Sequence, residues 1–307
     1  MKALFIGAGS IGKRHIRDFY NECRRNEVTP EIDVLRRAVG DLGDLEPMIT
    51  KQITEIQDYD YDGVFITNPT NLHFDALKKC KGRTKYYFIE KPIFESMRQI
   101  TDDLDIDDSN TYVAAPMRHT TLFRKLKETV ASHRVFSVRV ICSSYLPDWR
   151  KDVDYREVYS ARKEMGGGVN IDLIHEIDYI YDLFGSPDEV YAVSGKYSDL
   201  EITSNDLSVF ILKYKNTVCE IHLDYFGRQS RRTCELYTHE GTYIADFINE
   251  VMVLPDETTL NCHVMPNEEF INEMHYFYEF MMGKQTSINP PSLALKTLDI
   301  SLRGDTL

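Results

Sequence analysis

The feature that most constrains the fold of this chain is a glycine-rich turn near its first residue. Residues 2–6 are a short apolar run, residues 7–12 read GAGSIG, and residues 13–25 have apolar side chains at helical spacing. In this context the first glycine makes a tight turn, the second admits a diphosphate and the third lets helix and strand pack closely. The pattern predicts a dinucleotide site formed by Gly7, Gly9, Ser10, Ile11 and Gly12. The alternative is a glycine turn that holds no ligand.

The first part of the chain alternates apolar runs with helical stretches. Apolar runs typical of buried strands lie at residues 31–35, 63–67, 86–89 and 111–115. Alternation of this kind predicts a parallel sheet with helices on its faces. We therefore expect a Rossmann dinucleotide-binding domain over residues 1–119.

The pattern changes beyond about residue 133. Strand-like runs follow one another closely at residues 135–142, 190–194, 207–214, 217–223 and 232–238, with turn residues between them. Such strands pair antiparallel, and one apolar face of their sheet has to be covered. A helix over residues 170–184 is the expected cover, and a later helix is expected over 267–282. Residues 120–307 are thus predicted to form a second, α+β domain with a largely antiparallel open sheet. The last 20 residues carry no motif.

Charge and cysteine usage exclude several functional classes. The net charge is −13, which disfavours nucleic acid and anionic membrane surfaces as partners. The six cysteines include no C-x-x-C pair, so we expect neither a zinc site nor a disulfide framework, and no metal. No run of 18 apolar residues occurs. These features favour a cytoplasmic protein.

The end of the second predicted strand bears on cofactor choice. An acidic residue there binds the ribose 2′-hydroxyl of NAD, whereas arginine accommodates the 2′-phosphate of NADP. In this sequence Asp33 lies inside the strand, and Arg36 and Arg37 lie near its end. This order favours NADP over NAD weakly. The alternative is that both arginines are solvated surface charges.

Three motifs in order resemble the Gfo/Idh/MocA oxidoreductases, the relatives of glucose–fructose oxidoreductase and inositol dehydrogenase. They are the glycine fingerprint, the Glu90-Lys91-Pro92 sequence after a strand, and the segment GGGVNIDLIHEID at 166–178. Residues 145–162 further resemble a subgroup associated with bacterial surface-sugar pathways. The resemblance extends from residue 1 to about residue 285. It implies a homo-oligomer, a dimer or tetramer, that pairs through the open face of the second sheet.

The resemblance assigns catalytic roles to three residues. Lys91 matches the lysine beside the reacting oxygen, and Asp172 and His175 match the acid and histidine of the catalytic helix. Many members of the family have these two residues four apart; here, as in the subgroup, they are three apart. Either spacing keeps both side chains on one helix face. Histidine suits proton transfer near neutral pH, and lysine stabilises a developing alkoxide. The expected reaction is hydride transfer between nicotinamide and a secondary hydroxyl or keto group of a sugar, cyclitol or sugar nucleotide.

Further residues are expected around these groups. Cofactor contacts are predicted for the residues that follow the third and fourth strands, namely Asn68, Pro69, Thr70, His73 and Glu90. Substrate contacts are predicted for an arginine after the fifth strand, for the 145–162 loop and for the catalytic segment, namely Arg118, Trp149, Arg150, Tyr155, Arg156 and Asn170. An aromatic ring stacks on sugars and arginines bind carboxylate or phosphate, which favours an acidic sugar-like substrate.

Two other functions remain open from the sequence. One is a glycosidase that oxidises its sugar transiently with tightly bound NAD and shows no net redox change. The other is a non-catalytic regulator that senses a cofactor or sugar on a dehydrogenase scaffold, which the presence of Lys91, Asp172 and His175 argues against. The identity of the substrate and the direction of the reaction do not follow from the sequence.

Overall fold

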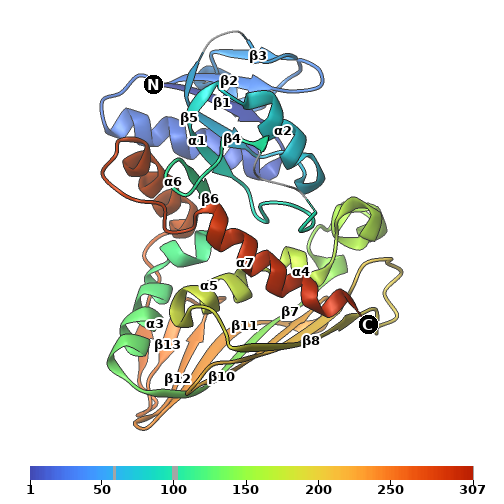
Figure 1. Cartoon of the computed structure of the whole chain (residues 1–307), viewed down its shortest axis with the longest axis vertical. Helices are drawn as coiled ribbons and strands as arrows, with labels where there is room; N and C mark the ends of the chain where they lie inside the picture. Colours follow the sequence, from blue (N-terminus) through green and yellow to red (C-terminus); the bar gives the residue numbers. More distant parts are fainter. Residues whose placement is uncertain (58–59, 99–102, 307) are drawn as a thin grey trace. The chain divides into compact units, whose positions relative to one another are not determined.

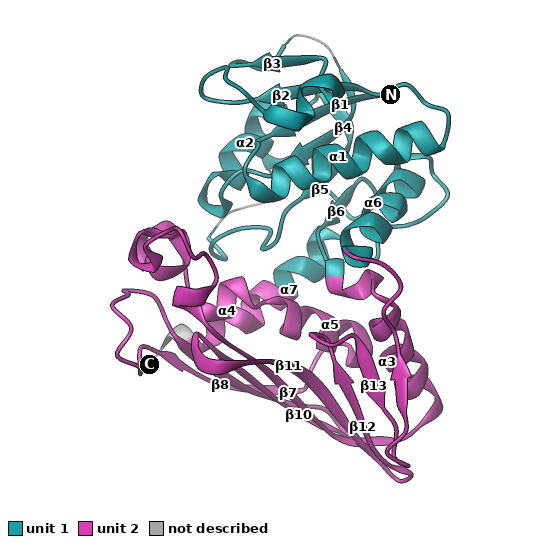
Figure 2. Cartoon of the chain, turned by 180° about the vertical axis from the view of Figure 1, so that it is seen from behind, with its two compact units in different colours: residues 1–116, 267–296 teal, residues 117–266, 297–307 magenta. Residues whose placement is uncertain are grey.

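The computed structural model describes residues 1–57, 60–98 and 103–306, and these form two compact units. Figure 2 distinguishes them: unit 1 comprises residues 1–116 and 267–296, and unit 2 comprises residues 117–266 and 297–307. The first boundary lies close to the predicted one at residue 119. The predicted second domain, 120–307, differs from unit 2, because residues 267–296 return to unit 1.

Unit 1 is built on a six-stranded parallel sheet, as the Rossmann prediction requires (Figure 1). Its strands lie in the order β3-β2-β1-β4-β5-β6. The order reverses between β1 and β4, and ligands of open parallel sheets bind at such a switch point, beyond the carboxyl ends of the strands. The bounds are β1 Lys2–Ile6, β2 Glu31–Leu35, β3 Lys51–Ile53, β4 Tyr61–Ile66, β5 Thr84–Ile89 and β6 Thr111–Val113.

Helices pack on this sheet through a core of aromatic rings. Helix α6 packs beside α1, and Phe277 of α6 places its ring 5.2 Å from those of Phe65 and Phe88. Phe65 also stacks on Phe5 at 4.1 Å. This shared core is why the returning segment belongs to unit 1. The bounds are α1 Ser10–Arg25, α2 His73–Cys80, α6 Glu268–Met281 and α7 Pro291–Leu302, and α7 spans the division between the units.

Unit 2 contains an eight-stranded sheet in the order β14-β13-β12-β11-β7-β10-β9-β8. Strands β7 and β10 pair in parallel, which the antiparallel prediction did not include, and the other described pairings are antiparallel. The largely antiparallel character is confirmed. The bounds are β7 Val135–Tyr145, β8 Glu189–Gly195, β9 Leu207–Lys213, β10 Val218–Asp224, β11 Phe226–Thr238, β12 Gly241–Asp246, β13 Val251–Val253 and β14 Thr259–Asn261.

One face of this sheet is covered and the other is open. Along β10, Cys219, Ile221 and Leu223 are fully buried, whereas Glu220 and His222 between them face outward. Helices α3 (Thr121–Ser132), α4 (Val169–Asp172) and α5 (His175–Phe184) lie over the covered face in Figure 1. The period-two burial is what an antiparallel sheet with one solvated face requires.

The prediction of one continuous helix over residues 170–184 is wrong, because the segment forms two helices. Helix α4 ends at Asp172, a turn occupies residues 173–174, and α5 begins at His175. Asp172 and His175 therefore do not share one continuous helix. The apolar spacing of this segment is the same for one helix or two, so the pattern did not reveal the break.

Short 3-10 turns complete the described structure. They are η1 Gly43–Met48, η2 Thr70–Leu72, η4 Pro116–His119, η5 Leu146–Asp148, η6 Tyr155–Glu157, η7 Tyr159–Ala161, η8 Lys163–Met165 and η9 Arg303–Thr306. Across the described residues, every helix is too short or too polar to cross a membrane. Within the same residues, no group of three or more His, Cys, Asp or Glu side chains is arranged to hold a metal ion.

Candidate active site

Residues 7–12 of unit 1 form the glycine turn, which we call the cradle. The fold requires glycine at two of its positions, and at a third there is free space beside the backbone. Gly7 has φ +101°, and a Cβ there would lie 2.9 Å from the backbone of Asn68. A Cβ on Gly12 would lie 2.6 Å from the carbonyl oxygen of Gly7. At Gly9, by contrast, no atom of the described residues lies within 4 Å of such a Cβ. The space beside Gly9 is where a ligand can approach the backbone.

The first turn of α1 faces this space. Gly9 is the N-cap residue, and no described side chain accepts a hydrogen bond from the first turn of α1. The N-terminus of a helix presents unpaired N–H groups and a partial positive charge, and both favour a phosphate. The open space and the uncapped N–H groups fit the diphosphate of a dinucleotide.

The residues after β4 border the same cradle. Asn68 keeps its side-chain oxygen buried with no hydrogen-bond partner in the described part of the chain, although its amide donates to the carbonyl of Leu72. The ring nitrogens of His73 lie 3.0 Å from the carbonyl of Asn68 and 3.1 Å from that of Ile93. Burial lowers the pKa of His73, and a neutral ring can donate a hydrogen bond to only one of these two carbonyls. Pro69 precedes η2, which begins at Thr70.

Glu90 and Lys91 follow β5 and lie in a polar cluster of unit 1. Glu90 Oε1 lies 2.5 Å from His15 Nε2, and Glu90 Oε2 accepts a hydrogen bond from the Lys91 backbone N–H at 3.1 Å. Burial raises the pKa of Glu90, but the His15 hydrogen bond and the charges of His15 and Lys91 outweigh it and hold this pKa below its usual value. His15 had not been predicted as a site residue; its position on the inner face of α1 looks like that of an ordinary core residue.

The end of β2 bears the two arginines of the cofactor prediction. Asp33 is buried and accepts a hydrogen bond from the Tyr61 hydroxyl at 3.0 Å, so it lies within the sheet. Arg36 donates to the carbonyl of Gly40 at 2.9 Å and to Gln52 Oε1 at 3.0 Å, and Arg37 is exposed. Basic side chains thus occupy the strand end where NAD-specific domains carry an acid.

In unit 2, Asp172 is held between two tyrosines. The Tyr225 hydroxyl donates to Asp172 Oδ2 at 2.5 Å, and the Tyr159 hydroxyl donates to Oδ1. Burial, together with the charge of Asp172, raises the pKa of both phenols well above the ordinary value, so both remain donors. Sequence reasoning missed Tyr225, because it lies on the chain 53 residues from the carboxylate it contacts and within no motif.

The other predicted residues of the catalytic segment lie nearby in the chain but differ in surroundings. His175 is half-buried at the first position of α5. Asn170 is 1% exposed, and its amide donates to the carbonyl of Ser301 at 2.9 Å. That bond ties α4 to the end of α7 within unit 2 and commits the amide to a backbone partner.

The loop over residues 145–162 forms a small pocket of about 70 Å³ beside Tyr159. Trp149 donates through its ring N–H to Ser144 at 3.0 Å and packs edge-on against Tyr225. The Tyr155 hydroxyl accepts a hydrogen bond from the Glu201 N–H. The pocket is lined by Leu146, Trp149, Arg150, Val153, Tyr155, Val158, Tyr159 and Ser160.

The arginines of this loop divide into paired and unpaired side chains. Arg156 makes ion pairs with Asp154 and Glu201, both at 2.7 Å. Arg162, likewise, is 3.0 Å from Glu157. Arg150 is exposed, lines the pocket and has no ion-pair partner among the described residues. Of the predicted substrate arginines here, Arg150 is the one whose charge the loop leaves uncompensated.

Arg118, predicted to contact substrate, is buried in an ion-pair cluster of unit 2. Its guanidinium lies 2.7 Å from Asp178 and 3.1 Å from Asp182, and the side chain is 1% exposed. Asp178 is on α5, so the arginine ties the segment after residue 116 to that helix. The guanidinium of Arg118 thus makes its hydrogen bonds to residues of unit 2.

We expect Arg118→Met to lower the free energy of unfolding by about 3–5 kcal/mol, because it leaves Asp178 buried without its partner, whereas Asp182 keeps its ion pair with Lys127 at 2.7 Å. Urea unfolding followed by circular dichroism measures this loss. The control is Arg156→Gln, which breaks ion pairs at an exposed site and is expected to cost about 0–1 kcal/mol. Equal losses for the two variants would contradict a buried structural role for Arg118.

Comparison with known proteins agrees with this geometry. Residues 1–114 match the model of an oxidoreductase family with an NAD-binding Rossmann fold, and residues 123–244 match that of the GFO/IDH/MocA C-terminal domain. The chain belongs to the Gfo/Idh/MocA family of oxidoreductases. The resemblance seen in the motifs is confirmed, and so is the fold class.

Individual Gfo/Idh/MocA relatives are distant. The chain is 25% identical over 215 residues to myo-inositol 2-dehydrogenase of Thermotoga maritima, covering 66% of this chain and 62% of the relative. An uncharacterized oxidoreductase of Bacillus subtilis, YrbE, is 24% identical over 69% of this chain and 63% of its own length. The alignments thus span less than two thirds of these relatives.

Solved structures resemble the chain over nearly its whole length. An oxidoreductase from Thermotoga maritima superimposes with a TM-score of 0.80 at 19% identity, covering 100% of this chain and 96% of its own. Levoglucosan dehydrogenase in complex with NADH has a TM-score of 0.79 at 18% identity, covering 99% and 95%. At these identities the likeness shows the shared fold.

Proposed function

We propose that this member of the family is an NAD(P)-dependent dehydrogenase or reductase that acts on a secondary hydroxyl or keto group of a sugar, cyclitol or sugar nucleotide. The observation that carries the proposal is the open cradle at Gly9 before an uncapped helix, with Glu90 and Lys91 held at the end of β5. Relatives named as inositol and levoglucosan dehydrogenases support the substrate class.

The predicted site residues have distinct tasks in this proposal. A bound nicotinamide supplies the acceptor or donor for the hydride. Lys91 stabilises negative charge on the reacting oxygen, and His175 takes up or returns the hydroxyl proton. Asp172, fixed by the hydroxyls of Tyr159 and Tyr225, presents a carboxylate of constant orientation to a sugar hydroxyl or to His175. These roles follow the family resemblance, and Tyr225 joins them as a residue that positions Asp172.

Turnover of a panel of substrates tests the proposal. Purified protein is mixed with NAD⁺ or NADP⁺ and with neutral sugars, cyclitols, sugar acids or sugar nucleotides, and the absorbance of reduced nicotinamide is followed. Substrate-dependent reduction of cofactor that disappears in Lys91→Ala is the expected result. Cleavage of a glycoside without net reduction would replace the proposal with the glycosidase. Cofactor binding without any turnover, unchanged in Lys91→Ala, would replace it with the sensor.

The preference between NADP and NAD is assigned to the end of β2, where we propose that Arg36 and Arg37 contact the 2′-phosphate of NADP. We expect the double variant Arg36→Asp/Arg37→Ala to weaken NADPH binding by about 10- to 100-fold, because each charge-assisted hydrogen bond contributes about 1.5–3 kcal/mol. Binding of NADH should stay within a few-fold of wild type. Calorimetric titration measures both, with Arg25→Ala on the far end of α1 as the control. An equal loss of affinity for NADPH and NADH would contradict this assignment.

The substrate itself is proposed to contact the loop over residues 145–162. Trp149 would stack on a sugar face, Tyr155 would line the pocket, and Arg150 would pair with a carboxylate or phosphate. Arg156 pairs with Asp154 of the loop and with Glu201 outside it, and we assign it the task of holding the loop in shape.

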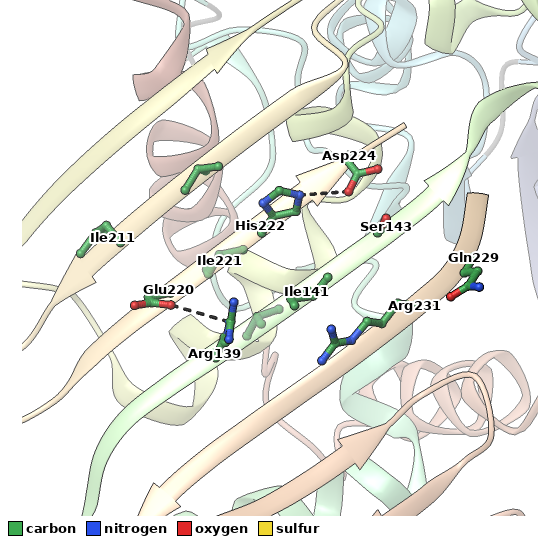
Figure 3. Close-up of a pocket in the computed structure, with 12 residues that line it drawn as sticks. Arg139, Ile141, Ser143, Ile211, Glu220, Ile221, His222, Asp224, Gln229 and Arg231 are labelled. Carbon is green, nitrogen blue, oxygen red and sulfur yellow. Dashed lines mark hydrogen bonds and ion pairs between the residues drawn. The ribbon is translucent and has the colours of Figure 1, made fainter. Parts of the chain in front are cut away.

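A homodimer, or a tetramer made of such dimers, is the proposed assembly. The open face of the unit 2 sheet holds a hollow of about 400 Å³, shown in Figure 3. Apolar Ile141, Val209 and Ile211 lie there beside the pairs Arg139–Glu220 and His222–Asp224. An apolar face rimmed by charged side chains of both signs suits a second copy of the same surface related by a two-fold axis.

A further inference from the structure

The histidine on the inner face of α1 has surroundings that a core residue does not need. The side chain of His15 is 0% exposed, and its Nε2 lies 2.5 Å from Glu90 Oε1. Its ring packs edge-on against Phe88 at 4.8 Å and Phe270 at 6.2 Å. Its other nitrogen, Nδ1, is buried without a hydrogen-bond partner among the described residues. Burying a polar atom without a hydrogen-bond partner costs free energy. We therefore look to the contact of Nε2 for the role of this imidazole.

The Nε2 atom of His15 holds the carboxylate of Glu90, the residue before Lys91. With one oxygen of Glu90 on His15 and the other on the Lys91 backbone N–H, the carboxylate cannot rotate without losing a hydrogen bond. His15 lies three residues after Gly12, on the helix that the glycine cradle opens. A single side chain therefore joins the cofactor cradle to the strand end that presents Lys91.

We infer that His15 is a positioning residue of this enzyme: it holds the Glu90 carboxylate in the orientation that sets Lys91 beside the cofactor. The inference rests on the proposed function for the role of Lys91 and on the geometry of unit 1 for the contact. His15 itself touches no reacting atom in this assignment.

The charges that face this pair set the expected pH response. On α1 His15 interacts with Asp18, which in turn faces Arg14 and Arg17 of the same helix and Glu269 of α6. Glu90 is also faced by Lys91 and by the ring of His73. Removing the His15 donor takes away the largest contribution that keeps Glu90 ionised, while burial remains. The pKa of Glu90 then rises, and the carboxylate takes up a proton as the pH falls.

The test compares His15→Phe, which keeps the aromatic packing, with His15→Gln, whose amide N–H still donates to Glu90. A carboxyl-labelled glutamate NMR titration between about pH 5 and 8 follows Glu90 directly, its signal assigned by its loss in Glu90→Gln. We expect Glu90 to titrate at higher pH in His15→Phe and to return toward wild type in His15→Gln. In turnover assays His15→Phe should lose about tenfold in kcat at the acid end and little at the alkaline end.

His275→Phe is the matched control. His275 pairs with Glu22 at 2.8 Å, also in unit 1 and away from the cradle, so its loss tests the general effect of breaking a His–Glu pair there. Unchanged titration of Glu90 in His15→Phe, or an equal change in His275→Phe, overturns the inference. The NMR titration needs neither cofactor nor substrate. Failure of the proposed function, seen as absent turnover by wild type, is therefore distinguished from failure of the inference.

Discussion

Replacing Gly9 with aspartate is expected to abolish binding of NADH and NADPH while leaving the protein folded. No described atom lies within 4 Å of a Cβ at this position, and φ is −69°, so an aspartate fits without strain. Aspartate is also a favourable N-cap residue, and its carboxylate would accept the hydrogen bonds of the first turn of α1. Those N–H groups would then be unavailable to a diphosphate, and the new negative charge would repel it. The affinity should fall by about 100-fold or more.

The measurement is calorimetric titration of wild type and variant with each cofactor, together with thermal unfolding. The matched variant is Gly12→Ala, whose Cβ would lie 2.6 Å from the Gly7 carbonyl and 2.8 Å from the Thr67 hydroxyl. We expect that variant to lose about 1–3 kcal/mol of stability as well as affinity. A Gly9→Asp protein that binds cofactor like wild type would show that the cradle does not hold the diphosphate.

Asp172→Asn is expected to reduce turnover by about 100- to 1,000-fold with cofactor affinity unchanged. The carboxylate accepts hydrogen bonds on both oxygens, from Tyr159 and Tyr225. An asparagine presents N–H donors to one of those hydroxyls, so one contact becomes donor against donor and the side chain reorients. It also removes the negative charge, and acid–base groups of this kind contribute about 10²–10⁴-fold to rate. The glycine cradle lies in the other unit, which is why binding should persist.

Steady-state kinetics with the substrate found in the panel, alongside cofactor titration, measures this effect. Tyr225→Phe is the control: it removes one donor and keeps the charge, so a loss of about tenfold is expected. Full turnover by Asp172→Asn would remove Asp172 from the catalytic set. A loss of cofactor affinity in the same variant would instead point to a folding defect.

Local patterns in the sequence were sufficient for the framework of both units. The strand–glycine–helix order at residues 2–25 predicts β1, the cradle and α1, because the positive φ at Gly7 and the close contact between Gly12 and Gly7 both lie within this segment. Closely spaced strand-like runs with turn residues between them likewise predicted five strands of the eight-stranded sheet, β7 to β11. The family also followed from short motifs in order, since each motif is contiguous in the chain.

The tertiary structure decided what lies against those motifs. Helix α6 returns to unit 1 because Phe277 completes an aromatic core with Phe65 and Phe88, a contact between residues far apart in the chain. The parallel pairing of β7 and β10 and the break between α4 and α5 have no local signature either.

The tertiary structure also decided which side chains contact the predicted site residues. His15 is fixed on Glu90, Tyr225 on Asp172, and Arg118 on Asp178, and each pair is separated by more than 50 residues. Side-chain type and helical or strand spacing report only which face of an element is buried. Which buried groups meet depends on how the elements pack. The sequence by itself therefore determined the fold class and the motifs from which the site is predicted, and the packing decided which side chains hold those residues in place.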